Sequence, residues 1–184
     1  MSDQENDKKM QEMAALYYFI EAYAYVTGEH LSDVQPSERP DFICIRETGE
    51  KVGVELVRIM RDRKHEQALW DRLLDKRDWA EVQETLDRLF NHADRKEEKR
   101  KESDWQVPDS CLLVIQLMDC PLDDFASQVD RSLIADFAAL GWQEIWAADF
   151  TVVEPFGEVW LFGLYPEKWW GPHPGPRAGT KPYG

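Results

Sequence analysis

The order of apolar and polar positions along the chain predicts an α/β protein. Residues 8–27 carry apolar side chains at helical spacing, and the pattern ends at Gly28, a favoured helix terminator. Residues 28–40 are rich in turn formers and contain prolines that exclude a regular helix, so a loop is expected there. The apolar segment 39–59 then predicts two short strands joined by a turn.

The second half of the chain continues the alternation of helices and strands. The predicted elements are a charged helix over 65–101, a strand covered on both faces over 110–117, a helix over 121–140, and two strands over 144–150 and 157–165. This order is typical of an α/β sandwich built on a mixed sheet. We expect residues 1–168 to form one domain and the Pro- and Gly-rich residues 169–184 to form a poorly ordered tail.

The turn of the predicted hairpin decides which side chains face each other. A three-residue loop, Glu47–Gly49, suits a bulged turn whose last residue takes a positive φ angle, which glycine adopts at little cost. Counting outward from that loop places Asp41 directly opposite Glu55 on one face of the sheet. A two-residue turn at Thr48 and Gly49 would instead place the two acids on opposite faces.

Two carboxylates at cross-strand distance, about 5 Å between their Cβ atoms, repel each other unless a positive charge lies between them. Mg²⁺ or Mn²⁺ would resolve the conflict, because both ions prefer carboxylate oxygens and retain waters that can attack a phosphodiester. Gly53 is expected to leave room for a ligand or a close backbone approach. In the alternative, Asp41 only begins a strand and Glu55 faces solvent, but apolar residues surround Glu55.

These residues resemble the PD-(D/E)XK, or restriction-endonuclease-like, nuclease superfamily. Asp41 in RPDF would be the PD aspartate, Glu55 in VELV the second acid, and Glu21 in YYFIEAYAY the helical glutamate. The resemblance spans roughly residues 12–165. It implies a three-layer α/β sandwich with a central mixed sheet flanked by helices, and metal-dependent hydrolysis of phosphodiester bonds in nucleic acid, with DNA favoured over RNA.

The chain departs from the family at the motif lysine, since Val57 occupies that position. Some families with this fold supply the cation from a following helix, and the run RKEEKRK offers Lys96, which we predict to take that role, and Lys99 one turn further. The weaker candidates for the cation or its substitute are Lys51, Arg58 and Gln67. The run is also typical of a solvated helical face made of ion pairs.

The net charge narrows the range of binding partners that the protein can have. A formal net charge of -14 argues against non-specific attachment to nucleic acid or to an anionic membrane, so a polyanion would have to meet a local basic patch. The second interpretation is therefore a catalytically inactive descendant of the same fold, whose acidic surface binds a basic protein. Formation of a homodimer is also open. The third is an α/β domain whose acids are structural.

The cysteines, the histidines and the absence of known motifs in the sequence indicate the compartment of the protein and exclude several other kinds of site. Three cysteines without CxxC spacing and a polar N-terminal segment predict a reduced, cytoplasmic protein. The four histidines lack metal-ligand spacing, and no phosphate-binding glycine motif or serine-hydrolase motif is present. No apolar run is long enough to cross a bilayer.

Overall fold

The structure is a computed structural model that describes residues 3–59, 79–101, 105 and 110–179. Within those residues, seven strands form one mixed sheet in which the strands follow each other in chain order. Their bounds are β1 Leu31–Pro36, β2 Phe42–Arg46, β3 Lys51–Ile59, β4 Cys111–Leu117, β5 Glu144–Asp149, β6 Trp160–Tyr165 and β7 Gly171–His173. Strands β3, β4 and β5 are parallel to one another, and the pairs on either side are antiparallel.

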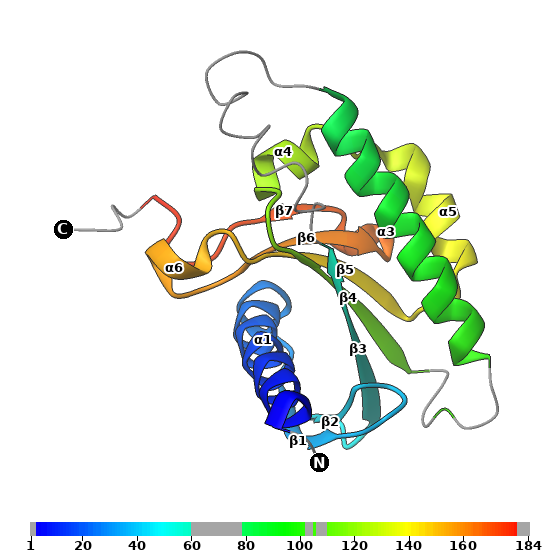
Figure 1. Cartoon of the computed structure of the whole chain (residues 1–184), viewed down its shortest axis with the longest axis vertical. Helices are drawn as coiled ribbons and strands as arrows, with labels where there is room; N and C mark the ends of the chain where they lie inside the picture. The colour runs from blue at the N-terminus through cyan, green and yellow to red at the C-terminus, as the bar shows by residue number, and fades with distance from the viewer. Residues whose placement is uncertain (1–2, 60–78, 102–104, 106–109, 180–184) are drawn as a thin grey trace.

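Helices cover both faces of this sheet (Figure 1). Their bounds are α1 Asp3–Thr27, α3 Trp79–Arg100, α4 Leu122–Ala126, α5 Ile134–Ala139 and α6 Val153–Phe156, with short 3-10 helices at Arg131–Leu133 and Glu167–Trp169. Helix α1 buries Leu16, Phe19 and Tyr23 against one face. Helices α3, α4 and α5 pack on the other face, where Leu89 of α3 and Phe125 of α4 enter the second core cluster. Among the described helices, none is long and apolar enough to cross a membrane.

The predicted hairpin register is confirmed. Ile43 pairs with Gly53 and Ile45 with Lys51, and the loop has three residues that end at Gly49 with a φ of 83°. The backbone N–H of Gly49 donates to the carbonyl of Arg46 at 2.9 Å, which closes the turn. The first helix and the strands β2 to β6 also lie where the sequence predicts them. The strand β4 is buried along its whole length, as a continuous apolar run requires.

The prediction of a loop over residues 28–40 is wrong for Leu31–Pro36, which form the edge strand β1. The polar residues of this strand are tolerated because only Leu31 is fully buried and the strand pairs on one side only. Proline is compatible with the end of an edge strand, where its missing N–H breaks no ladder. A register shift between Ser32 and Gln35, with Asp33 at a φ of 48°, absorbs the irregular sequence.

Two further expectations need correction. The single helix predicted over 121–140 is divided into α4 and α5, because the Asp130 side chain accepts a hydrogen bond from the Ser132 N–H and starts a separate 3-10 turn. The expectation of a poorly ordered tail is wrong for Gly171–His173, which pair with β6 as the strand β7. The part of the predicted charged helix over 65–78 lies outside the described residues.

Candidate active site

The hairpin brings Asp41 and Glu55 together on one face of the sheet, as its register predicts. Asp41 directly precedes β2, and Glu55 lies inside β3. Each carboxylate accepts a hydrogen bond from the backbone of the opposite strand: the Asp41 N–H donates to Glu55 Oε2 at 3.0 Å, and the Leu56 N–H donates to Asp41 Oδ2 at 2.9 Å. The two acids are therefore held in place by the sheet itself.

The environment disfavours two negative charges at this point. The Glu55 side chain is only 4% exposed, and Asp41 is partly buried. Burial and, after it, the charge of Glu55 raise the pKa of Asp41 to about 6, although the Leu56 N–H and Lys96 act in the opposite direction. Asp41 therefore exchanges its proton close to neutral pH rather than in the acidic range.

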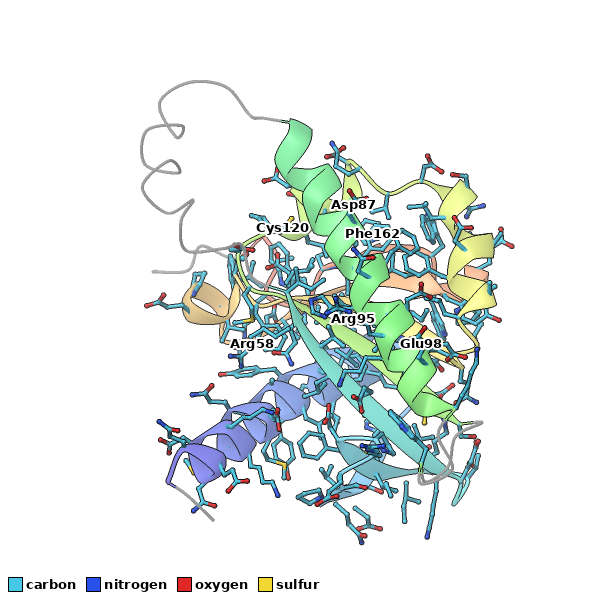
Figure 2. The ribbon with its side chains drawn as sticks, turned by 45° about the vertical axis from the view of Figure 1, so that its right-hand side comes forward. Arg58, Asp87, Arg95, Glu98, Cys120 and Phe162 are labelled. Atoms are coloured by element: carbon cyan, nitrogen blue, oxygen red, sulfur yellow. The ribbon has the colours of Figure 1, made fainter. Side chains whose placement is uncertain are left out.

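Lys96 reaches this pair from helix α3, because its ammonium forms an ion pair with Glu55 Oε1. Figure 2 shows α3 passing in front of β3, with the neighbouring Arg95 and Glu98 labelled along the helix. Val57, at the position of the family's lysine, is buried in the core that the sheet shares with α3. The structure thus joins three of the four predicted site residues: Asp41, Glu55 and Lys96.

The fourth predicted residue, Glu21, is not brought to the pair. It is exposed on α1, on the side opposite to the buried Phe19 and Tyr23. Another acid of the same helix, Glu12, lies close enough for its charge to raise the pKa of Asp41. Glu12 precedes Phe19 by seven residues and therefore shares its helix face, a signal that the sequence already contained.

The weaker candidates for the cation do not join the site. Lys51 pairs with Ile45 at the turn end of the hairpin and is exposed there. Arg58 follows the buried Leu56 by two residues, so its side chain points to the α1 face, away from Glu55. Gln67 lies outside the described residues, as does the side chain of Lys99.

Gly53 does not leave an open space for a ligand, contrary to the expectation from the sequence. A Cβ atom at this position would lie 2.6 Å from Pro40 Cγ and 2.7 Å from Cys111 Sγ. The missing side chain instead admits the ring of Pro40, the residue before Asp41. Gly53 therefore helps to set the position of the first acid.

A Gly53→Ala substitution should destabilise the protein by about 1–3 kcal/mol, because the new methyl group overpacks a filled site. The displaced Pro40 should also shift Asp41. Urea denaturation measures the first effect, and the affinity for Mn²⁺ measures the second. Unchanged stability in this variant would contradict the close contact between Gly53 and Pro40.

A second polar cluster lies on the α1 face, at the opposite end of β2, and sequence reasoning missed it. The Arg46 guanidinium donates to Tyr23 Oη at 3.0 Å and to Glu144 Oε1 at 3.3 Å, and it forms an ion pair with Glu29. Burial and the charge of Glu144 raise the pKa of Tyr23, so its hydroxyl stays protonated. The cluster borders a cavity of about 410 Å³.

Comparisons with protein families, with curated proteins and with solved structures find no match for the chain. Among the described residues, no group of three or more His, Cys, Asp or Glu side chains is placed to hold a metal ion. The acid pair offers two carboxylates and an adjacent lysine.

Proposed function

We propose that the protein is a Mg²⁺- or Mn²⁺-dependent nuclease of the PD-(D/E)XK type that hydrolyses phosphodiester bonds. The observation that carries the proposal is the convergence of Asp41 and Glu55, from one hairpin, with Lys96, from a helix that lies far from the hairpin in sequence. A buried and a partly buried acid beside one ammonium group are costly for stability, and such costs are typical of functional sites.

The arrangement of elements also supports this proposal. Helix α1 is followed by the strands β1, β2 and β3, then by α3 and the strand β4, which is parallel to β3. Asp41 stands at the beginning of the second strand and Glu55 inside the third, as the sequence resemblance implies. Helices on both faces of the mixed sheet are consistent with a restriction-endonuclease-like three-layer sandwich.

The residues present fit a hard divalent cation. Asp41 and Glu55 supply carboxylate oxygens. The pKa of Asp41 is raised because burial and Glu55 disfavour its ionised form, and a bound cation would stabilise that form. Two protein ligands are enough for Mg²⁺, which usually keeps several waters and binds substrate phosphates. When bound, the metal would polarise a phosphoryl oxygen and make a bound water more nucleophilic.

The side chains of the site have distinct roles in this proposal. Asp41 and Glu55 hold the cation and must be ionised to do so, so activity should fall as the pH drops through about 6, where Asp41 takes up a proton. Lys96 leaves its ion pair with Glu55 to contact the phosphate and stabilises the negative charge that develops there. Its origin on α3 explains how Val57 can replace the family's lysine.

Calorimetric titration of Mn²⁺ tests the proposal without a substrate. The wild type should bind the ion at a single site, and Glu55→Ala should abolish that binding because one of the two carboxylates is lost. Glu47→Gln, which removes an exposed acid in the hairpin turn, is the matched control and should bind as the wild type does. If the wild type fails to bind Mn²⁺, the nuclease proposal is refuted.

A Lys96→Met substitution should reduce metal-dependent cleavage of a DNA oligonucleotide by about a hundredfold, because the charge on the phosphate loses its partner. Binding of Mn²⁺ should persist in this variant, since both carboxylates are retained. Lys101→Met, five residues further along the chain and exposed, controls for the loss of a positive charge near the site. Equal activity of Lys96→Met and the wild type would remove Lys96 from the mechanism.

A second candidate function follows from the ion pair itself. Lys96 neutralises Glu55, and the described residues bring no third acid within metal-binding range of the pair. This arrangement also suits an inactive nuclease fold whose acidic surface binds a basic protein. Such a protein would retain its fold and its partner without binding Mn²⁺.

A further inference from the structure

The outer side of helix α1 carries an exposed stripe of apolar and aromatic side chains. Met10 is 70% exposed, Tyr17 54% and Tyr25 59%, and the exposed Ala14 and the charged Glu21 lie between them on the same side of the helix. The spacing of three or four residues keeps all five on one side of the helix, over about 22 Å at the helical rise per residue. The stripe lies opposite the buried residues of α1, so the sheet does not cover it.

A charged cavity begins where this helix ends. Gly28, Glu29 and His30 line the 410 Å³ cavity, and Gly28 follows Tyr25 by less than one helical turn. Four glutamates and only two cations face the cavity, which leaves an excess of two negative charges. The carboxyl end of α1 adds the negative pole of the helix dipole.

The cations of the cavity do not balance this charge. Arg46 is engaged with Tyr23, Glu29 and Glu144 and is largely buried. Lys168 lies over the ring of Trp169, 4.9 Å from its centroid. Glu47 is exposed at the rim and forms no ion pair with any described residue. The cavity therefore attracts a further positive group, and glutamate carboxylates are suitable acceptors for guanidinium N–H donors.

We propose that α1 and this cavity form a docking surface for a basic segment of a partner protein. Apolar side chains of the segment pack along Met10 and Tyr17, and one of its arginines enters the cavity beside Glu47. Tyr17 and Tyr25 also offer ring faces to cations. A second copy of the chain fits this surface less well, because each copy has a net charge of -14. This inference is independent of the acid pair at Asp41 and Glu55.

The test uses the full chain and two fluorescent synthetic peptides of identical composition. One peptide has leucines at helical spacing among arginines, and the other has the same residues in an order without an apolar side. The wild type should bind the first peptide about tenfold more tightly than the second, as fluorescence anisotropy measures. Equal affinities would show charge attraction alone and would overturn the proposal.

Substitutions on the protein locate the contact. Glu47→Lys should weaken binding of the first peptide about tenfold, and Tyr17→Ser should do so by a similar factor. Asp136→Lys makes the same charge change at an exposed site on α5, across the sheet, and should weaken binding by less than about twofold. Equal losses in Glu47→Lys and Asp136→Lys would overturn the proposal.

Sedimentation of the protein alone distinguishes the remaining occupant of the stripe. The wild type is expected to sediment as a monomer at concentrations where it binds the first peptide. A dimer that Tyr17→Ser converts to a monomer would assign the stripe to a second copy and overturn the assignment to a basic partner. All these substitutions are at exposed positions, so thermal unfolding should be the same in each variant as in the wild type.

Discussion

An Asp41→Asn variant is expected to lose Mn²⁺ binding and to hydrolyse DNA roughly a thousandfold more slowly, a loss of about 4 kcal/mol in transition-state stabilisation. The same variant should be more stable than the wild type at pH 7. Asparagine keeps an oxygen that can accept the hydrogen bond from the Leu56 N–H, but it places no negative charge beside Glu55. A gain in stability joined to a loss of activity is the signature of a functional site.

The pH dependence separates this explanation from a simple packing effect. The folded protein raises the pKa of Asp41 from 3.8 to about 6, so it binds the proton more tightly than the unfolded chain does. This favourable contribution is fully present below about pH 4 and is lost as the pH rises through 6. At pH 7 the ionised carboxylate therefore lowers the free energy of unfolding by on the order of 3 kcal/mol.

Urea denaturation without metal, at pH 7 and at pH 4, measures this contribution. The stability advantage of Asp41→Asn should be present at pH 7 and should disappear at pH 4, where the wild-type carboxyl is protonated. Asp136→Asn, at an exposed position on α5, should show no such pH-dependent difference from the wild type. Addition of Mn²⁺ at pH 7 should stabilise the wild type and Asp136→Asn, which keep both carboxylates of the site, but not Asp41→Asn. A variant less stable than the wild type at pH 7 would contradict the repulsion between the acids.

The register of the hairpin could be predicted from sequence because its determinants are local. A glycine at the end of a three-residue loop fixes the turn, and side-chain alternation then determines which residues share a face. The same argument placed Asp41 opposite Glu55. Local patterns do not determine the position of Lys96 in the same way, because the sequence shows only that it lies in a charged helix. Its contact with Glu55 depends on how α3 crosses the sheet.

The elements that sequence analysis missed depend on partners that are distant in the chain. Strand β7 has only three residues and gains its ladder from β6. Strand β1 contains more polar than apolar residues and is defined by its pairing with β2. Glu21 and Glu12 illustrate a different case, since the spacing of each residue to Phe19 is enough to assign them to different faces of the helix.

The cluster around Arg46 could not be predicted from any one segment. Its members come from α1, the loop after it, β2 and β5. A local signal did exist, because Arg46 continues the alternation of the buried Phe42 and Cys44 and should therefore face the core. An arginine at such a position requires acidic partners, but the sequence does not identify which of the 36 acids they are.

Truncation of this arginine, Arg46→Ala, should lower the free energy of unfolding by about 3–5 kcal/mol. The Arg46 side chain is 10% exposed and that of Glu144 is 8% exposed. Removal of the guanidinium therefore leaves the buried Glu144 carboxylate without a cation. The Tyr23 hydroxyl and the Trp146 indole N–H would still donate to Glu144, but neither carries a charge.

Two comparisons make the Arg46 prediction specific. Arg131→Ala removes an arginine from the exposed ion pair with Glu167 and should cost less than about 1 kcal/mol, because solvent screens that pair. Arg46→Lys keeps the charge but lacks the planar fork that reaches Tyr23 and Glu144 together, so an intermediate loss is expected. Equal losses in Arg46→Ala and Arg131→Ala, measured by urea denaturation at pH 7, would show that the buried cluster contributes no more than a surface pair. A large loss confined to Arg46→Ala would identify the cluster as the link that holds the C-terminal end of α1 to β2 and β5.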